Sequence, residues 1–261
     1  LGVDGSFPLG AAVTAVLLTR GCDPYLTLLA AVAAGALAGL CTGLIHVKLH
    51  VRDLLAGIIT MTALFSINLQ IAGSNLTVER AVDTIYSAHP TMALFGGLSL
   101  TYRKLAVSLV IVLLVKLLLD AFFSTKAGLL LRAVGDNPSL VTSLAKDRGS
   151  VKLAGLTLAN ALVALGGSLV CHETRSFSAT MGTGQLVFGL AAVIIGITLF
   201  RRMSFVKGTT AVVAGSVLYK LCIALALDLG LPPNMMKLIT AALFLLVLVA
   251  SGRKGEEIIH A

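Results

Sequence analysis

The stretch from Ser124 to Lys152 reads STKAGLLLRAVGDNPSLVTSLAKDRGSVK and separates two long apolar runs. No other long segment of the chain has the composition of a water-exposed element. A cluster of lysine and arginine in a short loop beside membrane-spanning ends marks the cytoplasmic side of a membrane. The stretch therefore predicts the orientation of the whole chain. Its basic residues are Lys126, Arg132, Lys146, Arg148 and Lys152.

A short helix is predicted to begin at Asn137 and Pro138. The asparagine side chain suits an N-cap, and proline suits the first helical position. Leu140, Val141 and Leu144 then share one face by the three-and-four spacing. Because a helix of about ten residues is marginal alone in water, this face needs a surface to lie against. Either the protein's own helix ends at the membrane interface or a cytoplasmic partner supplies that surface, and the pattern favours the partner.

The composition is that of a polytopic membrane protein. The chain is 57% hydrophobic and 12% charged, with a mean hydropathy of +0.98, whereas about a quarter of the residues of a soluble domain are charged. The net charge of +8 would favour nucleic-acid binding in a soluble chain. Here the basic residues gather in loops between apolar runs, so we expect no nucleic-acid partner and a lipid bilayer instead.

Eight apolar runs follow one another along the chain, and several approach the 20 or so residues that a spanning helix needs. The first and sixth are short and flanked by glycines, which predicts broken or re-entrant helices. The loops after the second, fourth, sixth and eighth runs are basic, as expected of loops on the cytoplasmic side. The runs are Phe7–Thr19, Leu26–Leu44, Leu54–Ala72, Leu105–Phe123, Leu153–Cys171, Gln185–Phe200, Thr209–Leu227 and Lys237–Ala250.

A weak internal repeat relates residues about 180 apart. Ala11-Ala12-Val13 recurs as Ala191-Ala192-Val193, and Ile59-Thr60 recurs as Ile239-Thr240. The first run then corresponds to the sixth, and an odd offset of five segments reverses direction across the membrane. This is an inverted repeat, the plan of many transporters.

The repeat predicts a single transmembrane domain over residues 1–261. The first repeat covers about 1–123, the second about 153–250, and the polar stretch 124–152 joins them. The run Leu153–Cys171 has no counterpart in the first half, which predicts a further helix upstream of Leu1. The expected fold is all-α and polytopic, with two short broken helices and one cytoplasmic helix.

Polar residues within apolar runs are candidates for lining a pathway, because polar groups in a bilayer face the protein interior. Two glycine-flanked segments, Asp4–Pro8 and Gly182–Gln185, lead into the short runs and are further candidates, because interrupted helices border cavities. The alternative is that each polar side chain hydrogen-bonds a neighbouring helix and that the glycines serve packing. The candidate pathway residues are Ser6, Phe7, Thr60, Asn68, Asn160, Thr183 and Gln185.

The remaining features give simpler interpretations. Lys116 and Asp120 have the spacing of an ion pair on one helix, and Gly35, Gly39 and Gly43 form a stripe typical of close helix packing. Cys22 and Cys171 both fall near the predicted outer face, where a disulfide is conceivable and free thiols are favoured.

No catalytic or cofactor site is predicted in this chain. His46 and His50 are four apart in a loop without further ligands, which argues against a metal site. Neither a GxxxxGK[ST] phosphate loop nor a nucleophile–histidine–carboxylate pattern occurs.

The segment from Ala127 to Pro138, with Lys152–Leu156 and Ala159-Asn160, resembles the main cytoplasmic loop of permease subunits of bacterial ABC importers. That branch takes up branched-chain amino acids, simple sugars and nucleosides. Val3–Phe7 and Gly57–Leu64 are similar to a less characterised subgroup, sometimes linked to tryptophan or related amino acids. The likeness covers nearly the whole chain.

The resemblance implies a multi-pass protein of the bacterial inner membrane, with about ten helical elements. It also implies a second permease subunit, as in a homodimer, an extracellular substrate-binding protein, and two ABC ATPase subunits that bind ATP and Mg. The short helix of the loop would sit in a groove of the ATPase and couple it to the permease. The implied coupling residues are Arg132, Gly135, Asp136, Asn137, Pro138, Leu140, Val141, Leu144 and Lys146.

Two other functions fit the same pattern. An ion-coupled secondary transporter is also built from inverted repeats, but it often uses acidic residues that are scarce in these runs. A membrane scaffold without transport is the third interpretation. The few charges within the runs favour a neutral or zwitterionic solute, such as an amino acid.

Overall fold

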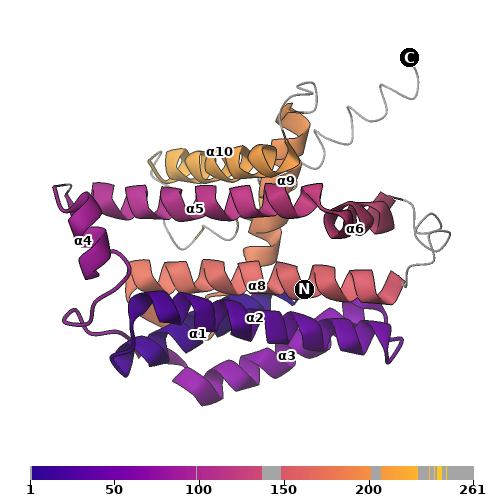
Figure 1. The fold of residues 1–261 in the computed structure, drawn as a ribbon, viewed down its shortest axis with the longest axis horizontal. Coiled ribbons are helices and arrows are strands. Elements are labelled where there is room, and N and C mark those ends of the chain that lie inside the picture. The colour runs from indigo at the N-terminus through magenta and orange to yellow at the C-terminus, as the bar shows by residue number, and fades with distance from the viewer. Residues whose placement is uncertain are drawn as a thin grey trace. The chain divides into compact units, whose positions relative to one another are not determined.

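The computed structural model describes residues 2–97, 99–136, 148–200 and 207–228, together with positions 235, 238, 240–242 and 245 (Figure 1). The chain divides into two compact units, 1–183 and 184–261. The first contains α1 (Val3–Thr19), α2 (Pro24–Val47), α3 (Asp53–Ala72), β1 (Asn75–Thr77), α4 (His89–Phe95), α5 (Leu100–Ser124), α6 (Lys126–Asp136), α8 (Arg148–Thr174) and β2 (Ser176–Ser178). The second contains α9 (Gln185–Phe200) and α10 (Gly208–Asp228).

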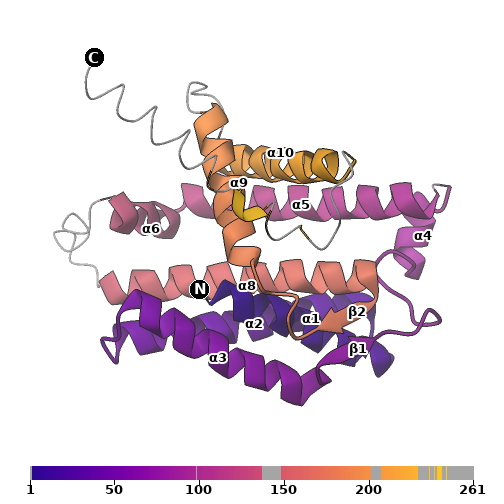
Figure 2. The ribbon, with the colours of Figure 1, turned by 180° about the vertical axis from the view of Figure 1, so that it is seen from behind.

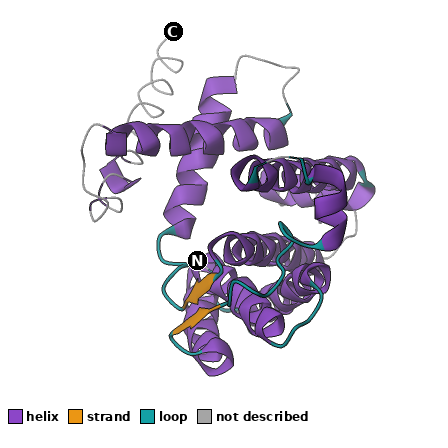
Figure 3. Ribbon diagram, turned by 90° about the vertical axis from the view of Figure 1, so that its left-hand side faces the viewer, coloured by secondary structure: helices purple, strands orange, loops and turns teal. Residues whose placement is uncertain are grey.

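The first seven predicted runs coincide with helices, and the eighth, Lys237–Ala250, lies mostly outside the described residues. Within the described part of the chain, five helices are long and apolar enough to cross a membrane: α2, α3, α5, α8 and α10. Helices account for nearly all of the described secondary structure, as Figure 3 shows. The prediction of an all-α polytopic membrane protein is therefore confirmed.

The two short apolar runs form the two shorter apolar helices, α1 and α9. Each is unbroken between its bounds, so the predicted interruptions are not found inside them. Pro8 is accommodated within α1, where it cannot donate the backbone hydrogen bond that would reach the carbonyl of Asp4. Most residues of α1 are buried, so this helix lies at the centre of the first unit.

The core of the first unit is α8 packed against α1 and α2 (Figure 1). A Cβ added to Gly35 or Gly39 of α2 would collide with the backbone of α8, and one added to Gly10 of α1 would collide with Ala164. Small residues allow helix backbones to approach this closely in a membrane. The glycine stripe of α2 therefore serves helix packing, as the sequence predicts.

The contacts between α1 and α8 keep one register. Ser6 bonds to Asn160 and Thr14 to Ser168, both across 154 positions, and Gly10 faces Ala164. Because both members of each pair advance together along the chain, α1 and α8 run parallel. The polar pairs lie one above the other along this interface.

The segments that follow α3 and α8 form a cap that the sequence did not predict. β1 and β2 lie side by side (Figure 2) and pair in antiparallel register. Leu76 is opposite Phe177. Arg175 donates to the carbonyls of Glu79 and Val82. Burial raises the pKa of Tyr86, whose hydroxyl lies 3.0 Å from that of Ser108. This cap joins the α3–α5 connection to the end of α8.

The second unit is built on the packing of α9 against α10. Gly196 of α9 and Gly215 of α10 are again sites where an added Cβ would meet backbone atoms. The rings of Phe188 and Tyr219 are 5.1 Å apart between centroids, and Lys220 Nζ lies 4.8 Å from the centroid of Phe188.

The helix α8, which the sequence assigns to the second repeat, packs within the first unit. The proposed repeat boundaries therefore do not mark where the compact units divide.

Candidate functional site

Three of the predicted pathway residues meet near the start of α1. Ser6 Oγ donates to Asn160 Oδ1 at 2.6 Å, and Asn160 Nδ2 donates to the carbonyl of Leu156 at 2.8 Å. Asn68 Nδ2 on α3 donates to the carbonyl of Gly5 at 3.2 Å. All three side chains are buried. We call Ser6, Asn68 and Asn160 the interior polar cluster.

The interior polar cluster makes hydrogen bonds between helices. Each member bonds across to another helix, which is the structural alternative that the sequence left open. One acceptor stands out: Asn68 Oδ1 is buried and has no hydrogen-bond partner among the described residues. A buried polar atom without a partner costs free energy. A further hydrogen-bond donor placed near Asn68 Oδ1 would remove that cost.

The other predicted pathway residues lie elsewhere. Thr60 is buried on α3 and donates to Ala56 of its own helix at 2.9 Å. Phe7 packs on α8 beside Gly166 and Gly167. Thr183 is exposed at the end of the first unit, whereas Gln185 begins α9 in the second unit.

Gly182, near the end of the first unit, lies against the segment Asp4–Pro8. A Cβ added to Gly182 would collide with the carbonyl of Asp4, which Pro8 cannot bond, and with Pro8 itself. The turn that leads toward α9 therefore covers the start of α1. The sequence singled out Gly182 and Asp4–Pro8 but could not place them in contact, because they are far apart along the chain.

Sequence reasoning missed two further buried polar pairs. Ser168 and Thr14 hydroxyls lie 2.6 Å apart, and Thr14 itself donates to the carbonyl of Gly10. Thr27 Oγ1 lies 3.0 Å from His172 Nε2. The recurrence of a polar residue eight positions after Ser6, and again eight after Asn160, is the signal that would have identified the first pair.

The polar stretch 124–152 begins with α6, a helix that the sequence analysis did not predict. Its Leu131 lies over Gly155 of α8, so close that a Cβ there would be 2.6 Å from Leu131 Cδ1. Arg132 lies over the ring of Phe123, with 4.8 Å from Cζ to the centroid. Gly128 permits a tight turn against Phe122. The first part of the stretch is therefore fixed to the ends of α5 and α8.

The remaining coupling residues divide by position. Gly135 is exposed near the end of α6, and Asp136 is its last residue. The predicted helix after Pro138 lies outside the described residues. So do Asn137, Pro138, Leu140, Val141, Leu144 and Lys146.

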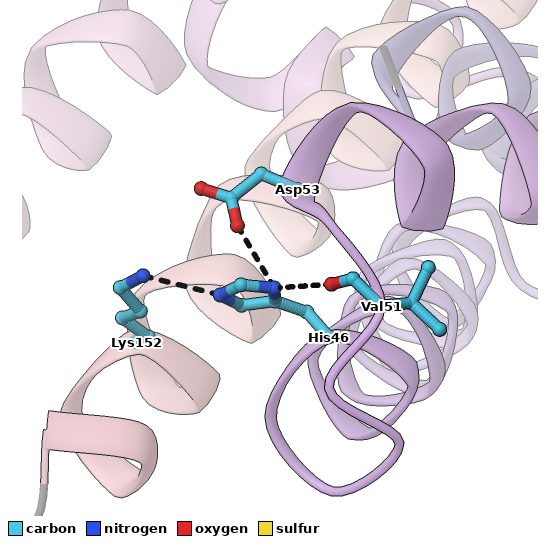
Figure 4. A network of polar contacts seen from close by, with 4 residues as sticks. All are labelled: His46, Val51, Asp53 and Lys152. Carbon is cyan, nitrogen blue, oxygen red and sulfur yellow. Dashed lines mark hydrogen bonds and ion pairs between the residues drawn. The ribbon is translucent and has the colours of Figure 1, made fainter.

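The end of this stretch makes a polar network with the turn between α2 and α3 (Figure 4). Lys152 Nζ lies 3.1 Å from His46 Nε2. His46 Nδ1 lies 2.8 Å from the carbonyl oxygen of Val51 and 2.8 Å from Asp53 Oδ1. We call His46, Val51, Asp53 and Lys152 the His46 network. Loops that charge alternation places on one side of the membrane thus meet in space.

Two of the simpler predictions are confirmed. Lys116 and Asp120 form an ion pair at 3.1 Å, and Cys22, Cys41, Cys171 and Cys222 are all free. The described residues contain no group of three or more histidine, cysteine or acidic side chains that could hold a metal ion.

Comparison with known proteins identifies relatives along almost the entire chain. Residues 1–248 match the family described as branched-chain amino acid transport system, permease component. The chain is 38% identical over 252 residues to the tyrosine transport system permease protein of Clostridioides difficile (strain R20291), covering 97% of this chain and 81% of that protein. It is 28% identical over 262 residues to an uncharacterized protein of Rickettsia prowazekii (strain Madrid E), covering 99% of this chain and 89% of that protein. No solved structure matches it.

The family match covers the first unit and most of the second, including the polar stretch and the interior polar cluster. The family is a membrane transport component and not a catalytic enzyme, and a permease of an ABC transport system implies ATPase and binding-protein partners. The chain therefore belongs to the branched-chain amino acid transport permease family and is a multi-pass inner-membrane permease of a bacterial ABC importer for amino-acid-like solutes.

Proposed function

We propose that this permease forms the translocation pathway of an ATP-driven importer for an aromatic amino acid and works by alternating access. The observation that carries the solute class is the 38% identity to a protein named as a tyrosine transport permease. The scarcity of charges within the apolar runs agrees with a zwitterionic solute whose charges are small in number and balanced.

The motor is a pair of separate ATPase subunits that bind ATP and Mg, and a second copy of this chain completes the pathway. ATP-driven closure of the ATPases moves the helix predicted after Pro138, and the attached helices then rock between two packings of similar free energy. The docking of α6 on α8 supports this mechanism, because it attaches the moving segment to the core of the first unit.

The pathway is proposed to include the interior polar cluster with Phe7, Thr60, Thr183 and Gln185. The buried, unpartnered Asn68 Oδ1 and the contact of Gly182 with Asp4 support this assignment. Asn68→Ala should then raise the KM for the solute, while a chain in which Asn68 only supports packing would lose stability without a change in KM.

The coupling role is tested by placing charge on the predicted docking helix. Leu140→Glu and Leu144→Glu should abolish co-purification of the ATPase or the coupling of ATP hydrolysis to transport, while the membrane fold stays intact. The matched control is Ser143→Glu, which adds the same charge off the apolar face and should retain coupling. Normal coupled transport by the leucine variants would refute the role.

The energy source is tested with the assembled importer in liposomes. Labelled L-tyrosine should enter only when ATP and the binding protein are both present. Uptake by the permease alone under an ion gradient would instead support a secondary transporter.

A further inference from the structure

The geometry of the His46 network fixes the roles of both ring nitrogens. A lysine ammonium can only donate hydrogen bonds, so Nε2 of His46 accepts from Lys152 at 3.1 Å. The ring proton is then on Nδ1, which donates to the carbonyl of Val51 at 2.8 Å. The imidazole is therefore neutral. Lys152 donates to His46, and His46 donates to Val51, which makes one continuous chain of hydrogen bonds (Figure 4).

This chain of hydrogen bonds joins three helices at one end of the first unit. His46 lies in the last turn of α2, Val51 lies two residues before α3, and Lys152 lies in the second turn of α8. The His46 side chain is 18% exposed, so its hydrogen bonds are partly shielded from water. Gly43 of α2 also packs against Leu153 of α8 at this end, where an added Cβ would be 2.7 Å from Leu153 Cδ1.

The contact with Asp53 contributes less than the hydrogen bonds to Lys152 and Val51. Because the ring is neutral, this contact is a hydrogen bond to a carboxylate and not an ion pair, and the Asp53 side chain is 77% exposed, so water competes for it. The carbonyl of Val51 accepts from the same ring nitrogen, so it holds the ring orientation without the carboxylate. The route that matters is therefore Lys152 to His46 to Val51.

The position of Lys152 gives the network its significance. Lys152 is the last residue of the basic stretch 124–152 and lies in α8. The helix α8 continues into the core of the first unit, where α8 contacts α1 and α2. Through the packing of Gly35, Gly39 and Gly43 against α8, a displacement of the stretch would act on α2. Through His46, it acts also on the turn that leads into α3, and α3 carries Asn68 of the interior polar cluster.

We propose that His46 is a positioning residue that transmits movement of the stretch 124–152 to the α2–α3 turn, so that α2, α3 and α8 move together in the transport cycle. The proposal rests on the ATP-driven function proposed above. It assigns a role to a histidine that the sequence pattern left without one.

The test compares four single variants, and the double variant His46→Leu with Lys152→Met, in the full chain assembled with its ATPase and binding protein in liposomes. His46→Leu removes both hydrogen bonds, Lys152→Met removes only the donor, and His46→Gln retains one donor and one acceptor. Asp53→Asn is the matched control, because it leaves the Val51 hydrogen bond in place. The readouts are solute transported per ATP hydrolysed, the ATPase rate and the melting temperature.

We expect His46→Leu and Lys152→Met each to lower the transport-to-ATP ratio about ten-fold, within the usual range of coupling effects. The double variant should be no worse than either single variant, because both break the same chain of hydrogen bonds. His46→Gln should recover most of the ratio, and Asp53→Asn should match the wild type.

Two results would overturn the proposal. An unchanged ratio in His46→Leu and Lys152→Met would show that the network does not transmit movement. A fall in transport that only follows a loss of folded protein or of ATPase activity would show that the network is structural. In both cases the wild-type chain would still import solute with ATP, so the proposed function would stand; a wild-type chain without ATP-driven import would overturn both.

Discussion

Ser6 on α1 donates a hydrogen bond to Asn160 on α8, with 2.6 Å between Oγ and Oδ1 and 154 positions between them in the sequence. Gly10 faces Ala164 and Thr14 faces Ser168 with the same offset. The parallel register of α1 and α8 is therefore held by two polar pairs, with the close backbone approach at Gly10 between them. Predictions about this interface test both the packing and the pathway.

The hydrogen bond between Ser6 and Asn160 should be measurable by a double-mutant cycle. Ser6→Ala and Asn160→Ala should each lower the free energy of unfolding, with a coupling free energy of about 0.6 kcal/mol and at most about 1.7 kcal/mol, as for other hydrogen bonds between membrane helices. The measurement is reversible unfolding in detergent or bicelles. Additive effects of the two substitutions would mean that the side chains do not interact.

The close approach of α2 to α8 at Gly39 should tolerate no side chain. Gly39→Val places a Cβ against the carbonyl of Leu156 on α8, and we expect the folded fraction to fall sharply, since overpacking a close contact costs at least about 1–3 kcal/mol. Gly189→Val is the control, because the space around Gly189 is open to 4 Å in α9. Size-exclusion chromatography and the melting temperature measure the difference. Equal melting temperatures of the two variants would contradict the packing described for α2 and α8.

The ion pair within α5 should show the asymmetry of buried charges. Lys116 and Asp120 are 21% and 10% exposed, so Lys116→Leu should destabilise the fold by removing the cation beside a partly buried carboxylate. The double variant Lys116→Leu with Asp120→Leu should be closer to the wild type in the free energy of unfolding. A double variant that is less stable than Lys116→Leu would indicate that Asp120 has a separate structural role.

The cysteines should react as free thiols. After denaturation without a reductant, an alkylating reagent should modify Cys22, Cys41, Cys171 and Cys222, since none is in a disulfide. In the folded protein, Cys171 should be protected because it is buried. Mass spectrometry measures both states. A missing label on Cys22 and Cys171 together in the denatured protein would reveal a disulfide between them.

The helices were predictable because length, apolar character and flanking charge are local properties. The runs Leu26–Leu44 and Leu54–Ala72 lie inside α2 and α3, and the packing role of the Gly35, Gly39 and Gly43 stripe was correct. The small helix α6 was missed, because its glycines at 128 and 135 weaken the helical pattern, and contacts with Phe123 and Gly155 hold it in place. Tertiary packing overrides local propensity in such a segment.

The sequence by itself determined that this chain is a polytopic membrane protein and where its apolar helices lie, because each polar group placed in a bilayer adds its own cost. Only the tertiary structure decided that Ser6 meets Asn160, that Gly182 covers Asp4 and that Lys152 reaches His46. Each of these contacts joins residues more than a hundred positions apart, and its register depends on how small side chains let two helix surfaces fit together.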